Sequence, residues 1–167
     1  MENKYINRYH TFCKSLKNLE KSKHADPNAD FVLEGTVQNF NLTFDISWKV
    51  MKDILIKRMG VIDFAIGSPR DTLQAAYTNG LIFDDEWLQM LRARNQLAHD
   101  YDGSYATEIF ELIISVFYDC FEKFKEHVSE YYTKEDLGTT LDTYLRGYIK
   151  AENQVNYYPK SNANRQQ

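Results

Sequence analysis

The chain has 167 residues, enough for one domain with a hydrophobic core that needs neither disulfides nor a structural metal. Hydrophobic residues make up 43% of the chain and charged residues 26%, which excludes a disordered or fibrous protein. The formal net charge of -4 excludes a broadly basic surface, so a nucleic-acid ligand would have to be held by a local group of residues.

The pattern of apolar residues and the two cysteines indicate the cellular compartment in which we expect the protein. The sequence contains no run of about 18 apolar residues and no apolar stretch near Met1, so we expect neither a membrane span nor a secretory signal. Cys13 and Cys120 fall at apolar helical positions, which favours buried free thiols over a disulfide. We therefore expect a cytoplasmic protein.

The first half of the chain predicts two helices. The first covers residues 4–22, and after a turn at residues 26–28 a long second helix covers residues 29–58, with Gly60 as its stop. Each has one apolar stripe at helical spacing. The stripes are Tyr5, Tyr9, Phe12, Leu16 and Leu19 in the first, and Leu33, Val37, Phe40, Phe44, Trp48, Met51 and Leu55 in the second.

Three further helices are predicted after a connection at residues 61–66. Ser68 and Pro69 are typical of a helix start, and this third helix ends near Gly80. The acidic run at residues 84–86 begins a fourth helix, which ends between residues 98 and 100. The fifth covers residues 105–132, with its inner face formed by Ile109, Ile113, Val116, Cys120, Phe124 and Val128.

These elements predict an all-α protein, an antiparallel up-and-down bundle of four to five helices over residues 1–133. Residues 134–167 are expected to be a C-terminal extension, with a short helix over residues 134–151. The polar, Asn- and Gln-rich residues 152–167 are expected to be disordered.

The end of the fourth helix holds the clearest chemistry in the chain. Asn95 and His99 continue the line of Leu88 and Leu91, with Arg94 on its flank, so we expect a polar pocket facing the neighbouring helices. Arginine holds a phosphate through two hydrogen bonds, and histidine moves a proton near neutral pH. This pair suits metal-independent RNA cleavage, in which the 2′-hydroxyl attacks the adjacent phosphate.

Such cleavage uses both a base and an acid, whereas one chain offers one histidine here. We therefore expect a homodimer with a composite site.

The Arg-x-x-x-x-His spacing is weak evidence for a catalytic site by itself, because it also fits a surface arginine and a histidine favoured by the negative end of the helix dipole. No metal-ligand spacing and no Gly-rich phosphate loop is found, so we expect no metal and no cofactor.

Several motifs in the same order resemble one family, the nucleotidyltransferase substrate-binding proteins of the HEPN superfamily. The segments that carry the resemblance are residues 39–49, Ser68-Pro69-Arg70, Ala75-Ala76, Gly80-Leu81-Ile82, and Trp87 followed by residues 94–101. The last segment resembles the family signature of Arg-Asn, three residues, His, any residue and Tyr. The resemblance covers roughly residues 5–130.

The resemblance implies an up-and-down helical bundle, usually dimeric, that binds a minimal nucleotidyltransferase (MNT) encoded beside it. In HepT-like members the pair is a toxin–antitoxin system, and the HEPN protein is a ribonuclease toxin that the MNT antitoxin neutralises. On this resemblance Arg94 and His99 are catalytic, Asn95 is supporting, and Tyr101 is the acceptor of AMP from ATP (AMPylation). A bulky anion two residues from His99 would exclude an RNA phosphate.

Two functions remain after this comparison. The chain is an endoribonuclease toxin, or it is a non-catalytic substrate-binding subunit of a nucleotidyltransferase complex. Intact Arg94, His99 and Tyr101 favour the toxin, because a scaffold needs no acid–base chemistry. Two features depart from the family pattern: Ala98 stands where many relatives carry Ser, and the tail after Thr133 extends beyond the usual domain.

Overall fold

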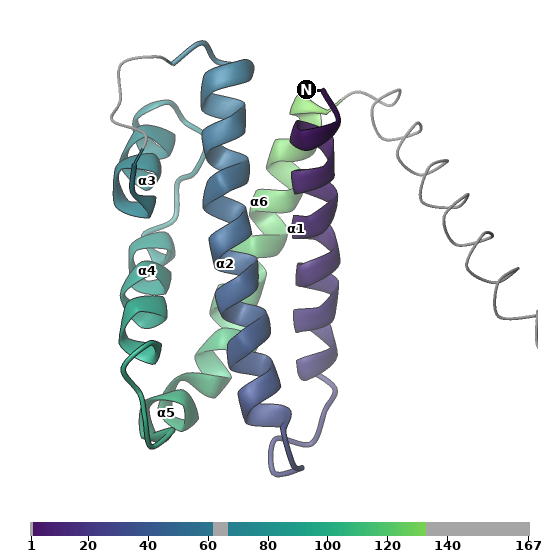
Figure 1. The fold of residues 1–167 in the computed structure, drawn as a ribbon, viewed down its shortest axis with the longest axis vertical. Coiled ribbons are helices and arrows are strands. Elements are labelled where there is room, and N and C mark those ends of the chain that lie inside the picture. The colour runs from purple at the N-terminus through teal and green to yellow at the C-terminus, as the bar shows by residue number, and fades with distance from the viewer. Residues whose placement is uncertain (1, 62–66, 133–167) are drawn as a thin grey trace, which may run out of the picture. The chain divides into compact units, whose positions relative to one another are not determined.

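The structure is a computed structural model that describes residues 2–61 and 67–132 (Figure 1). All regular structure in these residues is helical, which confirms the all-α class. The elements are α1 (Glu2–Ser22), α2 (Val32–Lys57), α3 (Pro69–Thr78), α4 (Glu86–Leu97), α5 (Ser104–Leu112), the π-helix η1 (Ile113–Phe117), α6 (Tyr118–Val128) and the 3-10 helix η2 (Ser129–Tyr131).

The helices form an up-and-down bundle. In Figure 1, α1 runs away from the N-terminus and α2 returns beside it, while α3 and α4 follow one another along the other side of α2. The segment of α5, η1 and α6 has no loop in it and runs back behind α1 and α2. The C-terminal end of α4 therefore lies at the same end of the bundle as the α1–α2 connection and α5.

Local chemistry sets most of the helix ends as the sequence predicts. Ser68 caps α3, and Pro69 opens this helix. Gly60 and Gly80 follow α2 and α3 with φ of 67° and 70°, a left-handed conformation that glycine adopts without strain. The predicted start of the second helix at residue 29 is wrong: Phe31 has a φ of 67°, so the helix begins at Val32.

The cap at Ser68 should contribute measurably to stability. Its hydroxyl accepts a hydrogen bond from the Asp71 N–H (3.1 Å) and donates one to the Asp71 carboxylate (2.7 Å). We expect Ser68→Ala to lower the free energy of unfolding by about 1 kcal/mol in urea denaturation. Ser115→Ala, at an exposed position inside a helix, is the control and should change it by less than about 0.5 kcal/mol. Equal effects of the two substitutions would contradict the capping role.

An aromatic cluster fixes the rotation of α4 in the core. Trp87 is 1% exposed, and its ring meets those of Phe121 and Phe124 edge-on, with centroids 5.6 and 5.3 Å apart. Phe44 of α2 lies on another side, at 6.5 Å. Because Trp87 is the first large residue of α4, this packing decides which side chains farther along the helix face the bundle.

The π-helix η1 changes the inner face of the last helix. The predicted Val116 is 40% exposed, whereas Phe117 is fully buried. A π-helical turn contains about one residue more than an α-helical turn, so the buried positions along this segment are Ile113, Phe117 and Phe121. The prediction for Val116 is therefore wrong, while those for Ile109, Ile113, Cys120, Phe124 and Val128 are confirmed. Figure 1 shows that the chain changes direction between α5 and α6, at η1.

Both cysteines are free thiols. Cys120 is buried, as expected, whereas Cys13 is only half-buried. Burial, aided by the nearby Asp84 carboxylate, raises the pKa of Cys120 to about 12. The Cys120 thiol is therefore protonated at neutral pH.

Some expectations fall on residues that the structure does not describe. These are the connection after Val61, the helix over residues 134–151 and the disordered tail over residues 152–167. The helices described above belong to one unit of the chain, Met1–Tyr132. Within the described ranges, no helix combines the length and the apolar character that crossing a membrane requires.

Candidate functional site

The buried face of α4 differs from the predicted one. Its buried side chains are those of Trp87, Met90, Leu91 and Ala93. Leu88 is 37% exposed, and Asn95 and His99 are both exposed. The prediction of a polar pocket buried by the helices of one chain is therefore wrong, because the packing of Trp87 turns the line of Leu88, Asn95 and His99 toward solvent.

Arg94 lies on the flank of the buried face and pairs with α2. Its Nε and Nη2 each donate a hydrogen bond to one carboxylate oxygen of Asp45, both at 3.1 Å. The two side chains are 38% and 32% exposed. An ion pair this accessible stabilises a fold by only about 0–1 kcal/mol. Its main effect is geometric, because two parallel hydrogen bonds fix the plane of the guanidinium.

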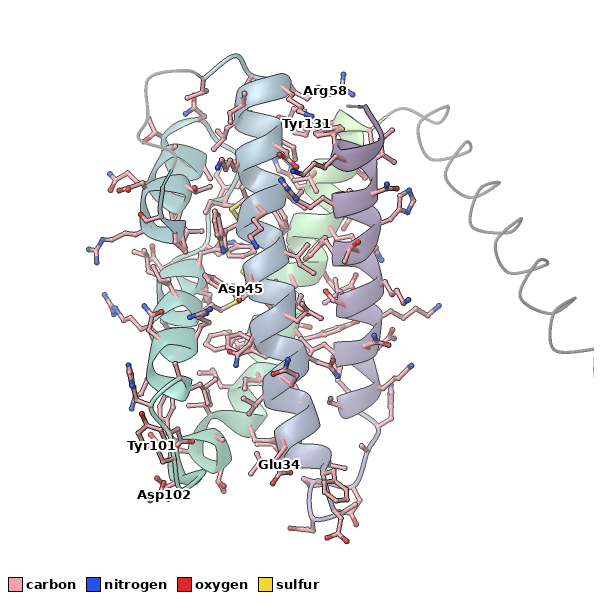
Figure 2. The ribbon with its side chains drawn as sticks, viewed as in Figure 1. Glu34, Asp45, Arg58, Tyr101, Asp102 and Tyr131 are labelled. Carbon is pink, nitrogen blue, oxygen red and sulfur yellow. The ribbon has the colours of Figure 1, made fainter. Side chains whose placement is uncertain are left out.

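Asp45 belongs to a polar band on one face of α2. Asn41, Asp45 and Trp48 are four and three residues apart, which places them on neighbouring turns of one helix face. The Asn41 Oδ1 and Trp48 Nε1 atoms are buried without a hydrogen-bond partner among the described residues. The carboxylate of Asp45 is the member of this band that reaches Arg94. Figure 2 shows Asp45 midway along α2, on the side of α4.

His99 lies beyond α4, in a turn that leads to α5. The helix ends at Leu97, and the His99 N–H donates to the Gln96 carbonyl at 3.0 Å. The next residue, Asp100, accepts hydrogen bonds from the backbone N–H groups of Tyr105 (3.1 Å) and Ala106 (2.8 Å). Its carboxylate thus ties the turn to the first turn of α5 and restricts the positions that His99 can adopt.

A cavity of about 410 Å³ opens at this turn. Its lining consists of Gln96, His99, Asp100, Tyr101, Asp102, Ser104 and Tyr105. Tyr101 is 92% exposed, and Figure 2 shows it beside Asp102 at the end of the bundle. Arg94 is not part of the lining: it lies within α4 and contacts Asp45 of α2, whereas His99 lies in the turn beyond the end of α4.

The structure thus divides the predicted site. It places His99 and Tyr101 at one open cavity, Arg94 against Asp45 of α2, and Asn95 on the outward side of α4. Among the described residues, no group of three or more His, Cys, Asp or Glu side chains is placed to hold a metal ion.

Two residues that shape this region were not among the predicted site residues. Asp45 lies within residues 39–49, the segment that resembles the family, but its pairing with a residue 49 positions away leaves no local pattern. Asp100 occupies the signature position that accepts any residue, and it lies four residues before α5 begins at Ser104, outside the usual N-cap position.

Comparison with known proteins gives one clear result. The model of the family described as nucleotidyltransferase substrate binding protein like matches residues 7–130. This range runs from α1 to η2 and includes Asp45, Arg94, His99 and Tyr101. Among curated proteins none matches the chain. Because the family match covers most of the chain and agrees with the helical bundle and with the motifs at residues 39–49 and 94–101, the protein belongs to the nucleotidyltransferase substrate-binding protein-like family.

Proposed function

We propose that the protein is a metal-independent ribonuclease toxin of a toxin–antitoxin pair, and that a cognate minimal nucleotidyltransferase neutralises it in the cytoplasm. One observation carries this proposal: a guanidinium held in a fixed plane and an exposed imidazole flank the end of α4 in a chain of this family. The two-pronged contact with Asp45 supports the proposal, because it fixes the plane in which the guanidinium would meet a phosphate.

The proposed cleavage of RNA requires a group that transfers a proton and a positive charge near the phosphate, which are the roles proposed for His99 and Arg94. The ribose 2′-oxygen attacks the adjacent phosphorus, the O2′–P bond forms, and the P–O5′ bond breaks. His99 takes the proton of the 2′-hydroxyl or gives one to the leaving 5′-oxygen. Arg94 stabilises the additional negative charge of the phosphorane. The products are a 2′,3′-cyclic phosphate and a 5′-hydroxyl.

A homodimer would complete this site. The outward line of Leu88, Asn95 and His99 on α4 is exposed in the single chain, and Leu88 gives it an apolar end. A twin chain seated against this line would add a second imidazole, so that one serves as base and the other as acid. Asn95 would then support the site from the interface. Sedimentation equilibrium should give twice the chain mass.

Tyr101 is the proposed acceptor of AMP. Its side chain is 92% exposed and lines the same cavity as His99. In the transfer, the Tyr101 oxygen attacks the α-phosphorus of ATP, the bond to the β-phosphate breaks, and pyrophosphate leaves. The attached phosphate would then repel an RNA phosphate from His99.

Mass spectrometry tests the modification. After incubation with the partner nucleotidyltransferase and ATP, we expect one added AMP, located on Tyr101, together with loss of RNA cleavage. Tyr101→Phe should remain unmodified and keep its cleavage activity. Tyr131→Phe, which changes another tyrosine, is the control and should be modified as the wild type is. AMP at another residue would contradict the role of Tyr101.

The alternative function is a non-catalytic subunit that presents a substrate to the nucleotidyltransferase. The family description favours this alternative, because it names substrate binding and no nuclease activity. Expression without any partner separates the two functions. We expect growth arrest and RNA degradation with the wild type, and neither with His99→Ala. Equal growth of both strains, with both proteins present at similar levels, would favour the binding subunit.

A further inference from the structure

The side of the cavity formed by α5 is closed to anions. The Ser104 N–H donates to the Asp102 carboxylate at 3.0 Å, and the N–H groups of Tyr105 and Ala106 donate to Asp100. A helix N-terminus with free N–H groups attracts phosphate. Here two carboxylates already occupy these donors, so a phosphate would meet negative charge, and a neutral group is favoured on this side.

Two tyrosine side chains line this cavity. Tyr101 is 92% exposed, and Tyr105 is half-buried. Burial raises the pKa of Tyr105, so its ring carries no charge at neutral pH. Any of the nucleobases can stack on an aromatic side chain, because each base has a flat π-face. The cavity volume of about 410 Å³ lies within the range of small-molecule sites, ~300–1,000 Å³.

Polar groups at the cavity match the edge of a base. Gln96 is exposed, and its carboxamide offers both a donor and an acceptor, which is the set that pairs with adenine through two hydrogen bonds. Hydrogen bonds from Ser104 hold the pKa of Asp102 below its usual range, so this carboxylate is a charged acceptor at neutral pH. A carboxylate accepts a hydrogen bond from the exocyclic amino group of a base and repels a carbonyl oxygen at the same position.

We propose that this cavity binds a nucleobase with an exocyclic amino group, adenine above all, from the RNA nucleotide next to the cleaved phosphate. The assignment of the base to an RNA strand rests on the proposed ribonuclease function, whereas base binding itself does not require cleavage. A free mononucleotide carries the same base, and the experiment separates the two sources.

The test follows the tyrosine ring signals of the wild-type protein by NMR, with Tyr101→Phe and Tyr105→Phe used to assign them. The ligands are AMP and the 2′-O-methyl tetranucleotides of adenine, cytosine and uracil, which resist cleavage because the attacking hydroxyl is blocked. We expect the adenine tetranucleotide to shift both ring signals and to bind at least tenfold more tightly than the uracil tetranucleotide. AMP should bind at least tenfold more weakly than the adenine tetranucleotide.

Two glutamines of α4 provide the matched variants. Gln96→Leu should weaken binding of the adenine tetranucleotide about tenfold, through the loss of a paired hydrogen bond. Gln89→Leu, at an exposed position outside the cavity lining, should change it less than twofold.

Three outcomes would overturn the inference: equal affinity for the three tetranucleotides, no shift of the two ring signals, or no effect of Gln96→Leu. Binding of AMP as tight as that of the adenine tetranucleotide would overturn the assignment to an RNA strand. Cleavage of ordinary RNA is measured in parallel. A wild type that binds adenine but cuts no RNA would contradict the proposed function and leave the base site standing.

Discussion

Replacing His99 with alanine is expected to reduce the rate of RNA cleavage by about 10²–10⁴-fold, because proton transfer by a positioned imidazole contributes about this much. The fold should not change, since His99 is exposed and lies in a turn after α4. Substitutions at such positions alter the free energy of unfolding by less than about 0.5 kcal/mol. The measurement is the single-turnover cleavage rate of a defined RNA, together with the urea midpoint.

His24→Ala is the matched control, because His24 is also exposed but lies in the turn after α1. It should cleave at the wild-type rate. If His99→Ala kept more than about half of the wild-type rate, the proton-transfer role would be refuted. A large drop in the urea midpoint would instead show that His99 acts through the fold.

Replacing Arg94 is expected to have an effect of similar size, and Asp45 should act through it. Arg94→Ala should reduce cleavage about 10²–10³-fold, the usual loss when one donor to a transition-state anion is removed. Arg94→Lys should recover only part of the rate, because an ammonium cannot form the two-pronged contact. Asp45→Asn should reduce the rate about tenfold, because the amide keeps one acceptor oxygen and loses one of the two hydrogen bonds that fix the guanidinium plane.

The double variant shows whether Asp45 is a positioning residue. If Asp45 acts only on the guanidinium, Asp45→Asn should cause no further loss when Arg94 is already alanine. Additive losses would mean that Asp45 contributes independently. Asp119→Asn, which removes the surface partner of Lys23 at 3.9 Å, is the control for the loss of an ordinary ion pair and should leave the rate unchanged.

Features set by neighbouring residues were predictable from the sequence. The cap at Ser68 and the stop at Gly60 depend on a few adjacent residues, and both are confirmed. Val116 was misplaced because the π turn adds a residue to one turn of the helix, and the spacing of apolar residues does not reveal where such a turn occurs.

The orientation of the site depended on long-range packing and was harder to predict. Leu91 belongs to two lines on α4, one with Trp87 and Arg94 and the other with Leu88 and His99. The pattern alone allowed either line to be buried. The structure buries Trp87 and Leu91 of the first line and leaves Arg94 at its half-exposed end, because Trp87 packs against Phe121 and Phe124 of α6. The same arrangement brings Arg94 to Asp45, a contact between distant residues that no local spacing could show.

The chemical identity of the cut ends tests the central claim most directly. Purified wild-type protein is incubated with an RNA of defined sequence in the presence of EDTA, and both product termini are determined by mass spectrometry. The account predicts a 2′,3′-cyclic phosphate and a 5′-hydroxyl from the wild type, and neither from His99→Ala. Products with 5′-phosphate ends, cleavage that EDTA abolishes, or uncut RNA would contradict it.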